Sequence, residues 1–117
     1  MALYNSKVGE LTHDNLFASA EMRQICQSVT VAAGQGTLKR GTVVALDGGK
    51  AKIMASGLTA HGILCDAVDT TGDEVAEIYV TGCFNKAALI VADGYELTAE
   101  DVNTMRNGGI FVENIVD

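Results

Sequence analysis

The sequence lacks any apolar run that approaches the roughly 20 residues needed to span a bilayer, and it does not begin with a basic segment followed by an apolar block. The first absence argues against a membrane span and the second against export. We therefore expect a protein that is made and kept in the cytoplasm. The chain has 117 residues, of which 48% are hydrophobic, and this size predicts one folded domain with its own core.

Positive charge is also scarce. The chain has 8 lysine and arginine residues against 15 aspartate and glutamate residues, which gives a formal net charge of −7. Nucleic-acid-binding proteins concentrate basic residues to displace counterions from phosphates. We therefore expect the chain to be repelled by DNA, and we exclude nucleic acid as a partner.

The number of cysteines is odd, so Cys26, Cys65 and Cys83 cannot all pair within one chain. Each lies in an apolar segment, where a free thiol behaves as a small hydrophobic group. We expect three structural thiols in a reducing compartment, so that alanine at Cys65 or Cys83 acts through packing. A cysteine-dependent enzyme would instead require one of these two thiols to be unusually reactive.

No stretch carries a complete catalytic or metal-binding motif. The segment from Gly36 to Thr42 has the glycines of a phosphate-binding loop, but Thr42 stands where the lysine must follow the second glycine. His61 and Cys65 are four residues apart and could form a thiol–imidazole pair or half of a metal site, yet no second pair with metal spacing exists. We expect no enzyme activity, no metal and no cofactor.

One lysine leaves a second class of function open. Lys52 follows the glycine turn of a predicted hairpin, as in domains that carry biotin or lipoate, although the flanking residues of those motifs are absent. A carrier or regulatory β module of a larger enzyme is thus the alternative function, and intact mass would reveal the modification. A calcium loop is not indicated, because the acidic residues of the central turn lack its spacing: Asp66, Asp69, Asp73 and Glu74.

The centre of the sequence, from Gly62 to Phe84, predicts a β-hairpin that organises the core. Apolar and β-branched residues form its two strands, and a turn-rich segment from Thr70 to Asp73 joins them. The apolar residues of the two strands are Ile63, Leu64, Ala67 and Val68, then Val75, Ile78 and Val80.

Further strands are predicted before this hairpin. Alternation of apolar and polar residues predicts a strand over Ile25 to Val31, and a second over Leu38 to Leu46 that Gly41 interrupts. Asp47 to Gly49 predict a tight turn that leads into Lys50 to Ala55.

After the hairpin, residues 85–92 predict a mixture of loop and strand. The predicted helix covers Thr98 to Asn107, with Thr98 as N-cap and Gly108 as the C′ residue. Ile110 to Val116 predict a closing strand with Ile110 and Val112 toward the core. The expected fold is mainly β, in the α+β class: a compact domain of short strands with one short helix near the C-terminus.

The first 21 residues show no sustained periodicity and predict an extended N-terminal arm, residues 1–21, ahead of a mixed-β domain, residues 22–117. A short helix capped by Thr12 or Asp14 is the alternative. The arm is too apolar for an inert tail, so we expect a partner surface to cover it. The residues expected to make that contact are Leu3, Tyr4, Val8, Leu11, Leu16 and Phe17.

The order of these segments resembles the head decoration proteins of tailed phages, the family of the phage lambda decoration protein D. The resemblance covers most of the chain and rests on SVTVAAGQGTLKRGTVVAL, GILCDAVD, TGCF and GGIFVENIV. The chain departs from the lambda protein in one respect, because it contains no proline whereas the lambda protein has a proline-bearing front.

The resemblance implies a structural protein that assembles as a homotrimer. The trimer would bind the major capsid protein at local three-fold points of an expanded head, on the outer surface of the virion, and reinforce the shell against packaged DNA. Before assembly it would reside in the host cytoplasm. The arm is then expected to add a strand to an exposed capsid edge, with three arms giving avidity.

Overall fold

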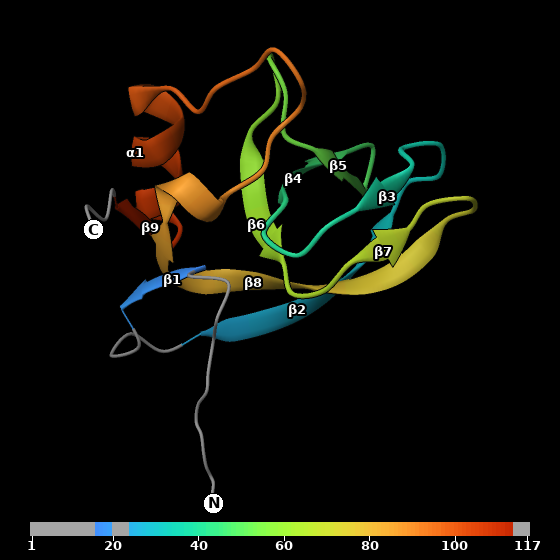
Figure 1. The fold of residues 1–117 in the computed structure, drawn as a ribbon, viewed down its shortest axis with the longest axis horizontal. Coiled ribbons are helices and arrows are strands. Elements are labelled where there is room, and N and C mark those ends of the chain that lie inside the picture. Colours follow the sequence, from blue (N-terminus) through green and yellow to red (C-terminus); the bar gives the residue numbers. More distant parts are fainter. Residues whose placement is uncertain (1–15, 20–23, 114–117) are drawn as a thin grey trace, which may run out of the picture.

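The computed structural model describes residues 16–19 and 24–113, which fold into a small β-barrel that carries a second sheet and a helix at one end (Figure 1). The helical segments are η1 (Lys86–Ala88), a single 3-10 turn, and α1 (Ala99–Asn107). The strands are β1 (Phe17–Ser19), β2 (Ile25–Val31), β3 (Thr37–Leu38), β4 (Val43–Asp47), β5 (Lys50–Ile53), β6 (Ala60–Leu64), β7 (Val68–Asp69), β8 (Glu74–Asn85) and β9 (Ile110–Glu113). The predicted fold class, mainly β with a short helix near the C-terminus, is confirmed.

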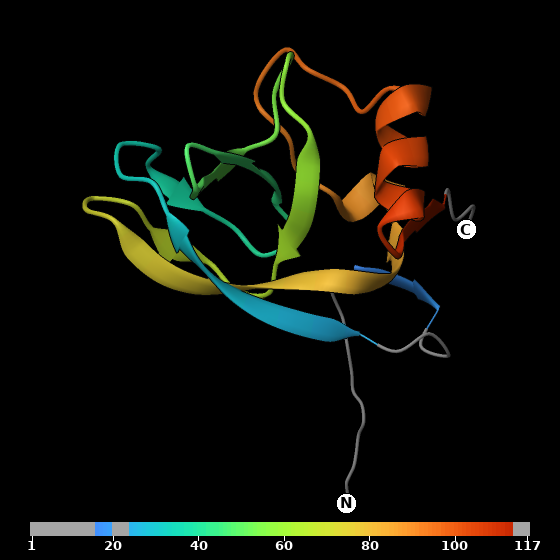
Figure 2. The same cartoon turned by 180° about the vertical axis from the view of Figure 1, so that it is seen from behind.

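The long strand β8 organises the barrel. It pairs antiparallel with β2 along one edge and with β6 along the other. The remaining strands complete a closed order, β8-β2-β5-β4-β6-β8, in which only the β2–β5 pairing is parallel. Figure 2 shows β2 and β8 side by side as a long, twisted pair of strands beneath the shorter strands. Closure leaves no free edge between these five strands.

Side chains that alternate along the barrel strands fill its interior. In β2, β4 and β8 every second residue points inward, because successive side chains of a strand lie on opposite faces. The residues of this barrel core are all aliphatic: Val31, Leu38, Val44, Ala51, Leu64 and Ile78.

The closure between β6 and β8 depends on a glycine. A Cβ atom at Gly62 would lie 2.8 Å from the backbone oxygen of Tyr79 and 2.5 Å from the Cδ1 atom of Ile78. Real Cβ atoms do not approach other atoms this closely, so a larger residue at position 62 would push β6 away from β8.

Beyond Gly82 the strand β8 changes partners. Its last residues pair antiparallel with β1 and parallel with β9, which forms a second, three-stranded sheet. This sheet, the outer wall of the barrel and α1 enclose a larger second core. The buried residues of this outer core are Leu16, Val43, Ala45, Met54, Ile63, Phe84, Leu97, Met105, Ile110 and Val112.

The helix α1 begins at a capping box. The Thr98 hydroxyl accepts a hydrogen bond from the Asp101 N–H, and the Asp101 carboxylate accepts one from the Thr98 N–H, each at 3.0 Å. The Tyr95 hydroxyl also donates to this carboxylate. The predicted N-cap is therefore confirmed. The predicted C-terminus is one residue off, because Gly108 is the C-cap with φ −91° and Gly109 takes the positive φ of +104°.

Two further predictions need correction. The central hairpin is confirmed only where β6 pairs with β8, because β7 pairs with β3 and the main partner of β8 is β2. Val75 and Ala67, predicted as apolar residues of the half-buried hairpin strands, are both exposed, Val75 by 72%. Local alternation predicts a strand's existence, but the long-range pairing decides which of its faces is buried.

Candidate functional site

The first described residues, 16–19, belong to the predicted arm of residues 1–21. Leu16 is 1% exposed and its side chain lies in the outer core. Its backbone oxygen accepts a hydrogen bond of 2.7 Å from the Asn85 N–H at the end of β8. The chain is therefore held at this point by both its backbone and its side chain.

Phe17 continues this attachment. In β1 it stands opposite Phe84, and its ring lies 5.3 Å from that of Phe84 and 5.2 Å from that of Tyr79, centroid to centroid. The rings of Tyr79 and Phe84 are 5.7 Å apart, which closes a three-ring aromatic cluster. Tilted and edge-on ring pairs at such separations add favourable contacts beyond burial alone.

Arg40 joins this cluster to the barrel. Its guanidinium carbon lies 5.7 Å from the ring centroids of both Phe17 and Tyr79. Its Nη1 atom donates hydrogen bonds to the Tyr79 hydroxyl at 3.0 Å and to the Cys65 carbonyl at 2.7 Å. Partial burial raises the pKa of Tyr79, although the hydrogen bond and charge of Arg40 oppose that shift. We call these four residues, Phe17, Arg40, Tyr79 and Phe84, the arm anchor.

Two of the residues predicted for the arm lie in the folded body. Leu16 and Phe17 were expected among the capsid-contacting residues of a free arm, but both pack into the folded body. Leu3, Tyr4, Val8 and Leu11 lie outside the described residues. The anchor itself could not be predicted, because no local pattern links Arg40 to rings 23 residues before it and 39 residues after it.

β1 is also an edge strand. It pairs with β8 on one side, and none of the other strands that the structure describes pairs with its second side. Edge strands present unpaired backbone groups that can accept a further strand. The second side of β1 is thus a candidate contact surface.

The lysine considered as a carrier site lies in an ordinary position. Lys52 is in β5 opposite Ala45, beyond the hairpin tip, and its ammonium group lies 3.2 Å from the Asp47 carboxylate. Lysines that receive biotin or lipoate need an exposed turn. The geometry therefore gives no support to the carrier function.

The segment that resembles a phosphate-binding loop also has a structural role. Thr42 is 1% exposed and its hydroxyl donates to the Lys39 carbonyl at 2.6 Å. Its backbone is paired with the 89–91 segment through an isolated bridge to Ile90. These contacts hold the residue inside the fold, where no phosphate could reach its hydroxyl.

The acidic residues of the central turn make local contacts. Asp69 accepts hydrogen bonds from the Thr71 hydroxyl and N–H, and these bonds lower its pKa. Asp73 lies 2.6 Å from the Lys50 ammonium group, whose hydrogen bond lowers its pKa. His61 contacts the Gln27 side chain at 2.9 Å. In the part of the chain that the structure describes, no group of three or more metal-ligating side chains is gathered.

The three cysteines differ in their surroundings. Cys83 is buried, as suits a structural thiol, whereas Cys65 is half-buried and Cys26 is exposed although each lies in an apolar segment of the sequence. Partial burial and the neighbouring Cys26 thiol raise the pKa of Cys65 to about 12, and burial followed by the charge of Glu113 raises that of Cys83. Raised pKa values are the opposite of the activation that a catalytic cysteine requires.

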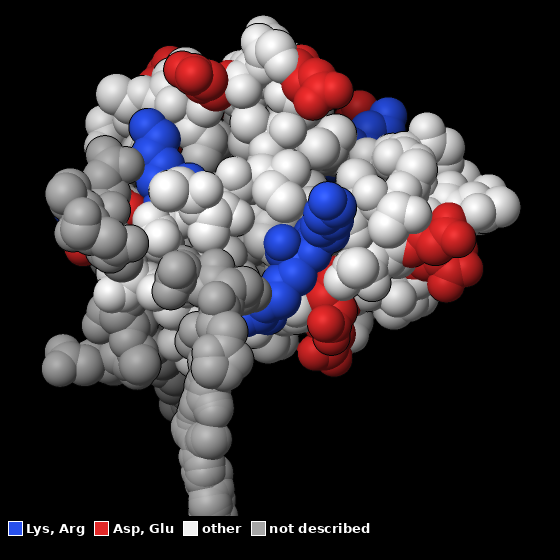
Figure 3. Space-filling view, viewed as in Figure 1, with Lys and Arg blue, Asp and Glu red and all other residues white. Residues whose placement is uncertain are grey.

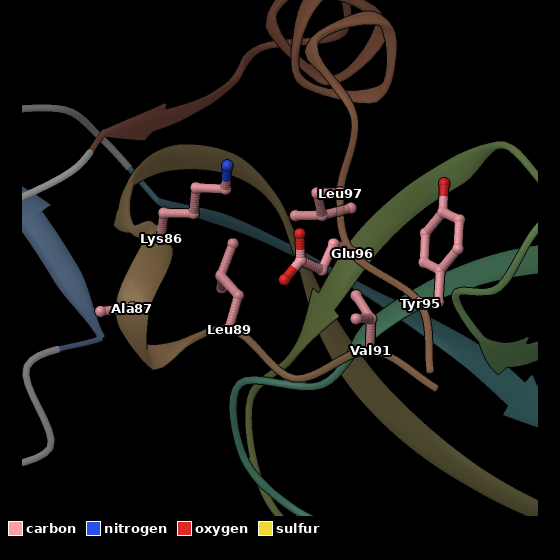
Figure 4. Close-up of a pocket in the computed structure, with 7 residues that line it drawn as sticks. All are labelled: Lys86, Ala87, Leu89, Val91, Tyr95, Glu96 and Leu97. Carbon is pink, nitrogen blue, oxygen red and sulfur yellow. The ribbon is translucent and has the colours of Figure 1, made fainter. Parts of the chain in front are cut away.

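An open pocket of about 340 Å³ lies beside η1 (Figure 4). Lys86 and Leu89 form one wall, and Glu96 and Leu97 the other. Its lining mixes apolar side chains with two opposite charges and brings together no nucleophile and base. The pocket therefore has no evident catalytic chemistry.

The surface carries its charges in separated groups. On the face shown in Figure 3, acidic side chains form small isolated patches and a basic band crosses the middle. No helix within residues 16–19 and 24–113 is long and apolar enough to cross a membrane.

The chain matches a known protein family over most of its length. The model described as Bacteriophage lambda head decoration protein D matches residues 7–110, which include the barrel, the arm anchor and α1. No curated protein sequence matches the chain significantly. The matched family consists of structural proteins of the phage capsid, in agreement with a fold whose candidate site is an anchor and a strand edge. The chain belongs to the bacteriophage lambda head decoration protein D family.

Proposed function

We propose that this head decoration protein binds as a homotrimer at local three-fold points of an expanded phage head and stabilises the shell against the pressure of packaged DNA. The observation that carries this proposal is the family match over residues 7–110. The partner is the major capsid protein. The net charge of −7 favours the outer surface of the head, because the DNA-filled interior would repel an acidic protein.

The N-terminal segment is the proposed capsid-binding element. With Leu16 and Phe17 assigned to the body, the proposed arm is residues 1–15, and Leu3, Tyr4, Val8 and Leu11 are its apolar contacts. We infer that it adds a strand to an edge of the capsid protein, so that backbone hydrogen bonds supply affinity and the apolar side chains supply burial.

The arm anchor supports this mechanism. A load applied to the arm reaches the body at Leu16, which is buried and hydrogen-bonded to Asn85, and then Phe17, which is stacked with Arg40. Tension from a shell under the pressure of packaged DNA would thus pass directly into the outer core. A flexible junction at this point would let the body swing and would transmit little of the load.

Trimer formation adds avidity. Once one arm of a trimer is bound, the other two meet the shell at high effective concentration, and weak single contacts add up to durable attachment. The rate at which a trimer leaves the shell therefore depends on the contacts of all three arms.

Binding to shells tests the proposal. Full-length protein should co-sediment with expanded shells of its own phage, reach saturation at three copies per local three-fold point, and leave unexpanded shells unbound. Light scattering at the loading concentration should give the mass of a trimer. Shells with bound protein should retain packaged DNA at temperatures that empty bare shells. Equal binding to expanded and unexpanded shells, or no protection of the DNA, would overturn the proposal.

A further inference from the structure

Two thiols from distant parts of the sequence meet on the outside of the barrel. The Sγ atoms of Cys26 and Cys65 lie 3.7 Å apart, which is contact distance for two sulfur atoms. Cys26 is near the start of β2, and Cys65 directly follows β6. β2 and β6 pair with opposite edges of β8, so the two thiols come together across β8.

The two thiols differ in access. Cys26 is exposed, so a dissolved reagent can reach it, whereas Cys65 is half-buried. Cys83 is buried in the second sheet and is not part of this pair. An exposed thiol with a second thiol at contact distance is the arrangement of an attacking and a resolving cysteine.

We propose that Cys26 and Cys65 are a redox site that forms a reversible intramolecular disulfide by exchange with a low-molecular-weight disulfide such as oxidised glutathione.

The exchange proceeds in two balanced steps. The Cys26 thiol loses its proton and attacks one sulfur of oxidised glutathione, which forms a mixed disulfide and releases one glutathione as its thiol. The Cys65 thiol then loses its proton and attacks the Cys26 Sγ atom, which forms the Cys26–Cys65 bond and releases the second glutathione. Two protein thiols are oxidised and one small disulfide is reduced to two thiols.

The first step favours the second. Burial raises the pKa of Cys65 most strongly, and the adjacent Cys26 thiol raises it further through its hydrogen bond and its charge when ionised. Once Cys26 is joined to glutathione, its thiol no longer contributes to the raised pKa of Cys65. Cys65 then becomes a thiolate more readily while its target is already in contact.

The bond requires a modest movement. The sulfur atoms must approach from 3.7 Å to the roughly 2 Å of a disulfide, and the backbones must follow. Both positions have irregular backbone, since the β2–β8 register shifts between Ile25 and Cys26 and Cys65 lies in a bend after β6. Regular strand would resist this movement more strongly.

The disulfide would join the two strands that flank β8. The pairing of β6 with β8 is short and consists of Ile63 opposite Tyr79 and Leu64 opposite Ile78. A disulfide at Cys65, directly after β6, would strengthen this part of the barrel. During assembly a reducing cytoplasm keeps the pair as thiols, and a released particle meets oxidising conditions. This timing rests on the proposed function, whereas the bond itself is a property of the free protein.

Oxidation of the full-length protein in solution, without shells, tests the proposal. The protein is equilibrated with oxidised and reduced glutathione, trapped by alkylation under denaturing conditions, and analysed by intact mass and non-reducing peptide mapping. We expect a Cys26–Cys65 cross-link within one chain, with Cys83 alkylated. The melting temperature should rise by about 10 °C on oxidation and return on reduction.

Matched variants separate the thiols. Cys26→Ser and Cys65→Ser should abolish the cross-link and the rise in melting temperature, and Cys83→Ala should keep both. A stable glutathione adduct on Cys26, or a disulfide between two chains, would overturn the proposal. Should Cys65→Ser fail to fold, a trivalent arsenical, which binds two adjacent thiols, can be used on the wild-type chain instead. It should bridge the reduced pair and be excluded after oxidation, and failure to bridge would equally overturn the proposal. These results do not depend on capsid binding, so they can fail while the proposed function holds.

Discussion

The barrel core and the outer core are built from different parts of the chain. The barrel core uses six aliphatic side chains between Val31 and Ile78. The outer core extends from Leu16 to Val112 and includes Phe84, Met54 and Met105. The barrel therefore closes with a continuous middle stretch, whereas the outer core is complete only when the two ends of the described chain are in place.

This difference gives the two cores different roles. The barrel supplies a rigid frame, and the outer core connects that frame to the N-terminal segment through Leu16 and the arm anchor. Changes in the barrel should alter stability alone. Changes at the anchor should alter both stability and the transmission of load from the arm.

Truncation should give the largest effect. Removal of residues 1–14 and removal of residues 1–19 differ by residues 15–19, which include Leu16 and the whole of β1 with Phe17. The longer deletion should cost about 4 kcal/mol more, because it empties the site of a buried leucine and removes one ring of the aromatic cluster. Urea unfolding of the two proteins measures the difference. Equal stability would show that the outer core does not depend on this segment.

A substitution at Gly62 tests the barrel closure. Gly62→Ala should destabilise the protein by about 1–3 kcal/mol, because the new Cβ atom would overlap the Tyr79 carbonyl and the Ile78 side chain. Gly72→Ala is the matched control, since a Cβ atom there has nothing within 4 Å. Thermal melting compares them. A Gly62→Ala variant as stable as the wild-type protein would mean that β6 and β8 leave room for a Cβ atom between them.

A change at Arg40 tests the arm anchor. Arg40→Lys should cost about 1–2 kcal/mol, because lysine keeps the charge but loses the planar stacking on two rings and the shared hydrogen bonds. Lys39→Ala, at the exposed neighbouring position, should have little effect. Chemical denaturation measures both. Equal losses in the two variants would remove Arg40 from the anchor.

The capping box should give the smallest effect and a dependence on pH. Thr98→Ala should cost about 1 kcal/mol, and Asn103→Ala on the exposed side of α1 serves as its control. Partial burial raises the pKa of Asp101, but hydrogen bonds from Tyr95 and Thr98 outweigh it and leave the pKa lowered. Its contribution is therefore present above the unfolded pKa of about 4 and is lost as the pH falls through the lower folded value. Between neutral and acidic pH, the melting temperature of Asp101→Asn should fall less than that of the wild-type protein. An identical fall in the two proteins would contradict this role of Asp101.

Local sequence predicted the elements whose signals are local. Ile25–Val31 is a strand because its side chains alternate, Asp47 to Gly49 make a turn because glycine takes positive φ without strain, and Thr98 caps α1 through its hydroxyl. These signals depend on neighbours in sequence. They needed no knowledge of the rest of the chain.

The predictions that were wrong concern contacts between distant residues. Phe17 was placed in a free arm because its neighbours show no period, but its attachment comes from Phe84, Tyr79 and Arg40. Val75 was placed in a half-buried strand because it is β-branched, but the pairing of β8 with β2 turns it outward. Sequence periodicity cannot predict such pairings, because register and partner are set by the whole fold.

Co-sedimentation with expanded shells of the phage tests the central claim most directly. The full-length chain is compared with the chain that lacks residues 1–14 and retains Leu16 and Phe17, after thermal melting has established that both are folded. We predict that full-length protein saturates the shells and that the truncated protein, with its body intact, stays in the supernatant because the three-fold avidity is lost. Saturation of the shells by the truncated protein would contradict the account, since the body and not the arm would then make the decisive contacts.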